Sequence, residues 1–294
     1  MIYKSSDAFR QALESRLLAM SQQEGIPLSW LRKMVAFDRF LARLTADRPQ
    51  EWLLKGGMAL RLRLDVAART TKDLDLLMTD DEPDIQEALV RAAQLDLDDW
   101  FRFTVRRSSY PISDNEAISR RFHAVASIAG RTFEQFHVDV GKNEPIVGAP
   151  ESFSMTPLLA FAGIKPATIL CYPIVQQIAD KIHAYTRPRP GGIGTRVKDV
   201  IDILLIARQQ TFSRTSLHQA LQSTFSFYNT HPFPKTIPDP PASWTPQFRQ
   251  LIKTTDLPYS TPVEAVHAMR ELVDPALQAA GDEHWRPATW SWES

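Results

Sequence analysis

Two aspartates two positions apart, Asp73 and Asp75, are the strongest chemical signal in the 294-residue sequence. They open the segment 73–78 (DLDLLM), which begins with the alternation of a β-strand. Side chains at i and i+2 of a strand leave the same face, so the two carboxylates can share a cation. Hard oxygen ligands of this kind suit Mg²⁺ or Mn²⁺, which also bind substrate phosphates. The pair therefore predicts a metal site, although an acidic pair alone is more often merely solvated.

A third carboxylate, Asp139, lies between two valines in the alternating segment 135–140. It should point to the strand face opposite the valines, which is an unusual place for an acid and needs a reason. On a strand next to the first pair it would complete a site for two metal ions. His137 shares its face and could be a neighbour of the metal, but a structural histidine is the more common case.

A glycine pair, Gly56 and Gly57, separates a short apolar strand at 52–54 from a helix that begins near Met58. Backbone N–H groups at such a turn can approach a triphosphate closely, and the positive end of a helix favours phosphate. The order of strand, glycine turn, helix and acidic strand favours a nucleotide site over a solvated acidic pair.

The second half of the chain offers a lysine and two acids on predicted helices. Lys181 lies within an apolar helical stripe, where it could neutralise phosphate charge or extend to solvent. Asp199 and Asp202 share a helix face three positions apart. They could orient Lys181, act as a base on an attacking hydroxyl, or form an ordinary ion-pair network. These alternatives stay open, as does the choice between the two acids.

Basic residues gather around the same helices, at Arg187, Arg189, Arg196 and Lys198. This density could hold a polyanion such as an RNA end, or belong to a solvated charged loop. Two further pairs, Arg106–Arg107 and Arg120–Arg121, could extend it, but nothing in the sequence places them on the same side.

The elements that would position these residues alternate in type over the first half of the chain. The pattern predicts helices near 9–18, 31–44, 58–62 and 85–95, and strands near 52–54, 73–78, 101–105, 123–128 and 135–140. From about Pro157 it predicts helices at 174–185, 196–208, 216–225 and 263–277, with an irregular proline-rich connection over 231–246. We therefore expect an α/β (α+β) fold with a mixed sheet in two lobes, a core lobe at 1–155 and a mainly helical lobe at 156–294.

Composition narrows the functional classes. Lys plus Arg and Asp plus Glu both number 34, so net charge gives no argument for binding nucleic acid or membrane. The single cysteine, Cys171, excludes an internal disulfide and a cysteine-cluster zinc site, and its apolar neighbours indicate a packing role. Since no apolar stretch approaches the roughly 20 residues of a membrane span, we expect a cytoplasmic protein.

Four segments, in order, resemble the AbiEii family of nucleotidyltransferase toxins, which includes the mycobacterial MenT group. They are LKGGMAL at 54–60, RTTKDLDL at 69–76, DKIHA at 180–184 and RVKDVIDI at 196–203. The matching family patterns are GG-x-AL, R-x-[ST]-x-D-x-D-L, [ED]-K-L-x-A and R-x-K-D-x-x-D-L, with isoleucine for leucine in the last two. Met58 departs from the wider polymerase β-like superfamily, in which a serine often touches phosphate, so that contact would come from the backbone or from Thr71.

The resemblance implies a polymerase β-like core and, with the motifs, assigns roles to individual residues. Catalytic roles fall to Asp73, Asp75, Lys181, Asp199 and Asp202. Metal binding falls to Asp73, Asp75 and Asp139. Nucleotide contacts fall to Gly56, Gly57, Arg69 and Thr71. A phosphate on Thr71 would disturb the binding of both metal and triphosphate.

The resemblance also implies a reaction and partners. A nucleoside monophosphate would pass from an NTP, with Mg²⁺ or Mn²⁺, to the 3′ acceptor end of tRNA, which blocks aminoacylation and translation. A cognate antitoxin, commonly a winged-helix DNA-binding repressor, would oppose it. Two alternatives remain: a nucleotidyltransferase acting on a small molecule or a protein hydroxyl, and a non-catalytic nucleotide-binding regulatory module.

Overall fold

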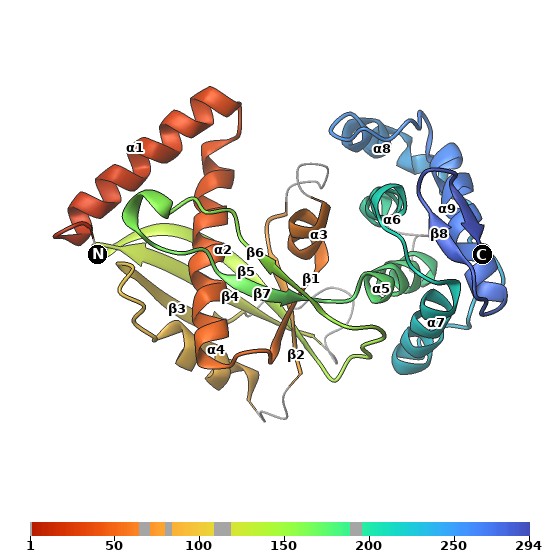
Figure 1. Ribbon diagram of the computed structural model, residues 1–294, viewed down its shortest axis with the longest axis horizontal. Helices are drawn as coiled ribbons and strands as arrows, with labels where there is room; N and C mark the ends of the chain where they lie inside the picture. The colour runs from red at the N-terminus through yellow and green to blue at the C-terminus, as the bar shows by residue number, and fades with distance from the viewer. Residues whose placement is uncertain (1, 65–70, 80–83, 109–118, 189–195) are drawn as a thin grey trace. The chain divides into compact units, whose positions relative to one another are not determined.

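The computed structural model describes residues 2–64, 71–79, 84–108, 119–188 and 196–294 (Figure 1). The chain folds into two compact units. The first comprises Met1–Met58, Thr70–Asn143 and Glu151–Cys171, and the second comprises Ala59–Arg69, Glu144–Pro150 and Tyr172–Ser294. The lobe boundary expected at residue 155 stays a prediction; the last strand of the sheet along the chain, Thr168–Cys171, lies beyond that residue and belongs to the first unit.

A mixed sheet forms the centre of the first unit, as the sequence predicts. Among the described residues the strand order is β3-β4-β5-β2-β1-β7-β6. The strands are β1 (Trp52–Lys55), β2 (Leu74–Met78), β3 (Phe101–Arg107), β4 (Ser119–Ile128), β5 (Arg131–Lys142), β6 (Glu151–Ser154) and β7 (Thr168–Cys171). β2 runs parallel to β5 and β1 runs parallel to β7, whereas the other neighbouring pairs are antiparallel.

Three helices cover one face of this sheet: α1 (Ser6–Glu24), α2 (Leu28–Asp47) and α4 (Ile85–Ala93). In α2, the rings of Phe37 and Phe40 lie 5.0 and 5.6 Å from the ring of Phe136 on β5. Val138 and Val140 are buried on the same side of β5. Since side chains alternate along a strand, the residues between them point to the opposite face of the sheet.

A β-bulge sets the register of β4 and β5. Ser127 pairs with Thr132 and Ala126 pairs with Glu134, so Phe133 is an extra residue on β5. Phe133 is buried, and its ring packs edge-on against Phe101 at 5.6 Å. The bulge therefore lets both Phe133 and Phe136 reach the core, although three positions separate them and a regular strand would turn one of them outward.

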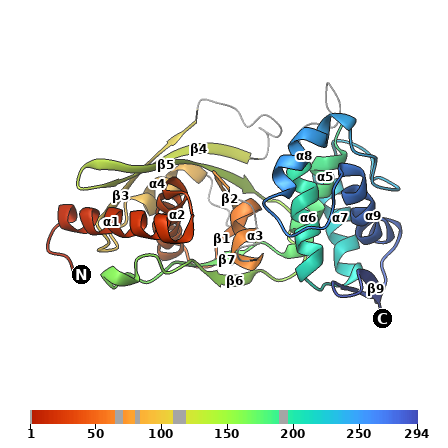
Figure 2. The ribbon, with the colours of Figure 1, turned by 90° about the horizontal axis from the view of Figure 1, so that it is seen from above.

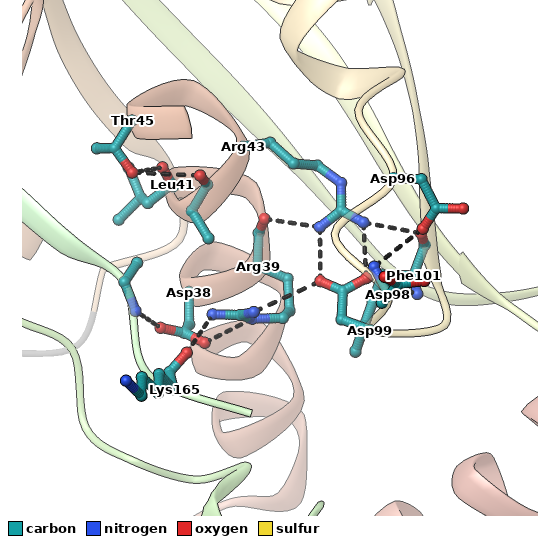
Figure 3. A network of polar contacts seen from close by, with 12 residues as sticks. Asp38, Arg39, Leu41, Arg43, Thr45, Asp96, Asp98, Asp99, Phe101 and Lys165 are labelled. Carbon is teal, nitrogen blue, oxygen red and sulfur yellow. Dashed lines mark hydrogen bonds and ion pairs between the residues drawn. The ribbon is translucent and has the colours of Figure 1, made fainter. Parts of the chain in front are cut away.

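A buried ion network ties α2 to the sheet (Figure 3). Arg43 donates to both carboxylate oxygens of Asp99, at 2.8 and 2.7 Å, and to the carbonyl of Phe101 at 2.9 Å. Arg39 donates to Asp38 at 2.8 Å, and Asp38 accepts from the backbone N–H of Ala167 at 2.7 Å. Burial raises the pKa of Asp38, against the lowering effect of Arg39. The network holds α2 against one face of the sheet, and the candidate site residues lie on the other face.

The second unit is mainly helical, as predicted, and is built from α5 (Ile174–Thr186), α6 (Val197–Gln209), α7 (Arg214–Tyr228), α8 (Thr245–Ile252) and α9 (Pro262–Gln278). Figure 2 shows α5, α6, α7 and α9 packed side by side. Leu60 and Leu64, from α3 (Gly56–Leu64), join their apolar core. The sequence did not predict α8 or the hairpin of β8 (His284–Arg286) and β9 (Ser291–Glu293). Among the described residues, no helix has the length and apolar character to cross a bilayer.

A histidine is buried at the end of α5. His183 shares a hydrogen bond of 2.9 Å with the Thr230 hydroxyl, and its ring stacks on Tyr228 at 4.6 Å. Burial, followed by the positive charges of His231 and Arg187, lowers the pKa of His183 to about 4. The folded protein therefore holds this imidazole neutral where an unfolded chain would protonate it.

We expect the stability of this unit to fall as the pH is lowered from 6.5 towards 4. The unfolded chain binds the proton first, so the contribution of His183 is complete above pH 6.5 and decreases by about 3 kcal/mol as the pH approaches 4. Urea unfolding at pH 7.5, 6.5, 5.5 and 4.5 measures this slope. The His183→Gln variant, which can still hydrogen-bond but does not titrate, should have a shallower slope, and equal slopes would contradict the assignment.

Candidate active site

A row of charged residues crosses the sheet on the face opposite α2. The strand register pairs Lys55 with Asp75, Asp75 with Asp139, and Asp139 with Arg121. Directly paired residues point to the same side of a sheet, so four strands contribute to one row. The orientation predicted for Asp139 is confirmed by its place between the buried Val138 and Val140.

Asp73 lies directly before β2 rather than inside it. The buried hydroxyl of Thr71 donates to its backbone carbonyl at 3.2 Å, and its carboxylate lies 3.6 Å from Nδ1 of His137 on β5. His137 in turn faces His123 on β4, with 5.7 Å between the ring centres. Thr71 therefore shapes the entry into the acidic strand, and its side chain is already engaged with the backbone.

Arg121 forms a bidentate ion pair with Asp139. Its Nε and Nη2 donate to the two oxygens of Asp139, at 2.8 and 2.7 Å. The hydrogen bond from Arg121 to Asp139 is the main cause that raises the pKa of Arg121, and the charges of Asp139, Asp73 and Asp75 add to it. The predicted acids therefore share one electrostatic environment, with a cation that the sequence could not place.

Gly56 is required by a close approach of Asp75. Its φ of +61° lies in the left-handed region, which residues other than glycine rarely adopt. A Cβ on this residue would overlap Oδ2 of Asp75 and lie 2.7 Å from its Cγ. The glycine turn and the acidic strand are therefore one unit, in which the Asp75 carboxylate occupies the space left by the missing Cβ. Gly57 is buried in the first turn of α3.

The donor set fits a divalent cation of the Mg²⁺ type. Within the described ranges, no three or more His, Cys, Asp or Glu side chains are arranged to hold a metal ion. Mg²⁺ does not need such a cage, because it commonly binds through one or two carboxylates, several waters and substrate phosphates. Asp73 and Asp75 can supply that pair, whereas both oxygens of Asp139 are bound by Arg121.

In the second unit, Lys181 is held between the two acids of α6. Its Nζ lies 2.8 Å from Oδ2 of Asp202 and 3.2 Å from Oδ1 of Asp199. Asp202 is 1% exposed and Asp199 is 8% exposed. Arg196 adds a longer contact to Asp199 at 3.4 Å. The contacts fit both an ion-pair network and acids that orient Lys181, so the catalytic roles of these three residues stay a prediction.

Two predicted basic residues, Arg69 and Arg189, lie outside the described residues. Among the arginine pairs that could have extended a basic patch, Arg121 instead forms an ion pair with Asp139. A sequence signal for this pairing did exist: Phe133 and Phe136 are apolar residues three apart in a strand, which is typical of a bulge. Only with that bulge does counting back from the hairpin turn bring Arg121 opposite Asp139.

Comparisons with known proteins agree with these features. A family model described as "Nucleotidyl transferase AbiEii toxin, Type IV TA system" matches residues 39–282. The fold is similar to that of MenT4, a nucleotidyltransferase toxin from Mycobacterium tuberculosis H37Rv, with a TM-score of 0.54, 18% identity, and 90% of this chain and 98% of that chain covered.

Two other solved structures are less similar. JHP933 from Helicobacter pylori has a TM-score of 0.45 and 12% identity, with 84% of this chain and 91% of that chain covered. The antibiotic-resistance factor ANT(2'')-Ia has a TM-score of 0.34 and 15% identity, with 76% and 95% covered. A search of curated protein sequences finds no match. The family model spans most of the chain and includes all four motif segments between residues 54 and 203. The protein therefore belongs to the AbiEii family of nucleotidyltransferase toxins of type IV toxin–antitoxin systems.

Proposed function

We propose that this nucleotidyltransferase is metal-dependent and transfers a nucleoside monophosphate from an NTP to the 3′ acceptor end of tRNA, which blocks aminoacylation. The observation that carries the metal and nucleotide part is the packing of the Asp75 carboxylate against Gly56, beside Asp73. It combines a place for a cation with a turn whose backbone can approach phosphate. The tRNA end rests on membership of the family.

In the proposed reaction, the acceptor hydroxyl oxygen loses its proton to solvent and bonds to the α-phosphorus, the bond from that phosphorus to the β-phosphate bridge breaks, and pyrophosphate leaves. Asp73 and Asp75 would hold a divalent cation, while Gly56, Gly57, Thr71 and Arg69 would position the triphosphate. A bound cation would lower the pKa of the attacking hydroxyl and offset charge on the leaving group. Asp139 as a further metal ligand stays a prediction, since both of its carboxylate oxygens accept from Arg121.

For the second unit we propose that Lys181 is a catalytic cation oriented by Asp199 and Asp202. Support comes from its two short contacts to buried carboxylates, which fix an otherwise flexible ammonium group. A fixed cation stabilises the negative charge that develops on transferring phosphoryl groups. The family also implies an antitoxin partner, which we propose to be a winged-helix DNA-binding repressor.

Labelling with one NTP at a time tests this function. The purified protein is incubated with each α-³²P-labelled NTP, Mg²⁺ or Mn²⁺, and whole-cell RNA, and the products are separated on a sequencing gel. We expect label on species of tRNA size, no label with EDTA, and no label on RNA whose 3′ diol was oxidised with periodate. Label on protein or on a small molecule, with tRNA unlabelled, would overturn the acceptor assignment.

Gly56→Ala should reduce transfer by about 100-fold or more, because the new methyl group displaces the Asp75 carboxylate. The matched control is Gly25→Ala, since Gly25 has a φ of +69° and open space around the added Cβ. Both variants should lose about 1 kcal/mol or more of stability from the strained backbone. Steady-state transfer rates and thermal melts separate the effects, and a Gly56→Ala protein as active as Gly25→Ala would refute the close approach.

A further inference from the structure

The Arg121 guanidinium binds Asp139 through one edge, and its other edge, formed by Nη1 and Nη2, points away from that carboxylate. Nε and Nη2 donate to Asp139 in a bidentate pair. Within the described part of the chain, no hydrogen bond is formed by Nη1. A guanidinium carries five N–H donors in a planar fork, so the edge formed by Nη1 and Nη2 keeps the geometry that matches two oxygens of a phosphate.

The Arg121–Asp139 ion pair is partly buried. The side chain of Arg121 is 27% exposed and that of Asp139 is 16% exposed, on the sheet face opposite α2. A ligand can therefore reach the outer edge, while Asp139 restricts the orientation of the arginine. An arginine held in advance loses less rotamer freedom on binding than a free one.

The negative charges around the Arg121–Asp139 pair also stabilise the positive charge of Arg121. Asp73, Asp75 and Asp139 bring three negative charges near one guanidinium, and all three act on its pKa. A divalent cation on Asp73 and Asp75 would neutralise the two charges that compete for Arg121. The outer edge of the guanidinium would then face a phosphate without strong competition from these acids.

We propose that Arg121 binds a phosphate group of the reacting substrates beside the Asp73–Asp75 pair, and that Asp139 is its positioning residue rather than a third metal ligand. The inference rests on the proposed nucleotidyl transfer, since it places Arg121 in that same site. The phosphate belongs either to the NTP or to the backbone of the RNA acceptor, and separate binding measurements distinguish these sources.

The test measures binding without turnover in Arg121→Gln, Arg121→Lys, Asp139→Asn and the double variant Arg121→Gln/Asp139→Asn. Mn²⁺ affinity is read by electron paramagnetic resonance, affinity for a non-hydrolysable α,β-methylene NTP by calorimetry, and affinity for tRNA by filter binding. Arg102→Gln is the matched control, because Arg102 forms an Arg–Asp pair with Asp96 at 2.6 Å on an exposed part of the same unit. Thermal melts check that each variant folds.

We expect Arg121→Gln to weaken either the NTP analogue or tRNA by about 10- to 100-fold, with Mn²⁺ affinity unchanged. Arg121→Lys should recover only part of that loss, because a lysine cannot donate bidentately. Asp139→Asn should weaken the same ligand by a smaller factor and leave Mn²⁺ affinity unchanged, and the double variant should lose no more than Arg121→Gln alone.

Two results would overturn the inference. One is a loss of Mn²⁺ binding in Asp139→Asn, which would make Asp139 a metal ligand. The other is an Arg121→Gln protein that binds both the analogue and tRNA as the wild type does. If the wild type itself binds no NTP analogue, the proposed function fails, which is a separate outcome from either of these.

Discussion

Asp75→Asn should lower nucleotidyl transfer by about 1,000-fold while the protein stays folded, and Asp73→Asn should do the same. The amide keeps the shape of each side chain but removes the negative charge that binds a divalent cation. The packing of Asp75 against Gly56 leaves little room for another side chain to take over. Single-turnover transfer with labelled NTP measures the loss, and Mn²⁺ titration should show weaker metal binding in both variants.

The control for this prediction is Asp96→Asn, the same change at an exposed carboxylate paired with Arg102. It should transfer at the wild-type rate. Expression in bacteria gives a second measurement, since the wild type and Asp96→Asn should slow growth and Asp75→Asn should not. An Asp75→Asn protein that still transferred nucleotide at a tenth of the wild-type rate would remove the metal site from the proposal.

Lys181→Met is expected to cost about 3–5 kcal/mol of stability and to abolish transfer. The change leaves Asp202 and Asp199 buried without their main cation, and removing one partner of a buried ion pair is far more costly than replacing the whole pair. Urea unfolding measures the first effect. Lys253→Met, at the exposed end of α8, is the control and should be close to neutral.

A double variant separates packing from catalysis at this position. Lys181→Met/Asp202→Leu removes both the ammonium and the most buried acid, so it should recover part of the lost stability. Transfer should stay at background, because no cation remains to act on phosphate. If activity returned together with stability, Lys181 would be a structural residue only.

The acidic pair and the glycine turn could be located in the sequence because each lies within a short segment with characteristic spacing. Gly56 directly follows β1, whose last residue, Lys55, pairs with Asp75 on β2, and the close approach of Asp75 to Gly56 depends on that pairing and was not predicted. The orientation of Asp139 followed from the alternation of β5. The contact between Lys181 and the acids of α6 was one alternative among several, since helix spacing alone cannot tell which helices pack together.

Other parts of the fold depend on long-range packing that a local pattern does not contain. β7 is a short strand that contains the buried Cys171 and pairs in parallel with β1, a position set by the rest of the sheet. The β8–β9 hairpin has no clear alternation but is held by the buried Trp285, whose indole N–H donates to the carbonyl of Ala207 at 2.7 Å. α8 follows a proline-rich stretch and has Pro246 as its second residue, which suits a first helical turn but resembles a loop in sequence.

The bulge at Phe133 makes the chemistry of the site depend on a count of residues in the hairpin. Deleting Phe133 itself would leave Arg121 across from Asp139, because the bulge already omits that residue from the pairing. With the bulge kept, deleting His137 or Val138 would instead bring Asp139 across from Phe122, so that either Asp139 would enter the core or Phe122 would leave it. Length changes in this hairpin should therefore be tolerated at its bulged position and not at the two positions directly before Asp139.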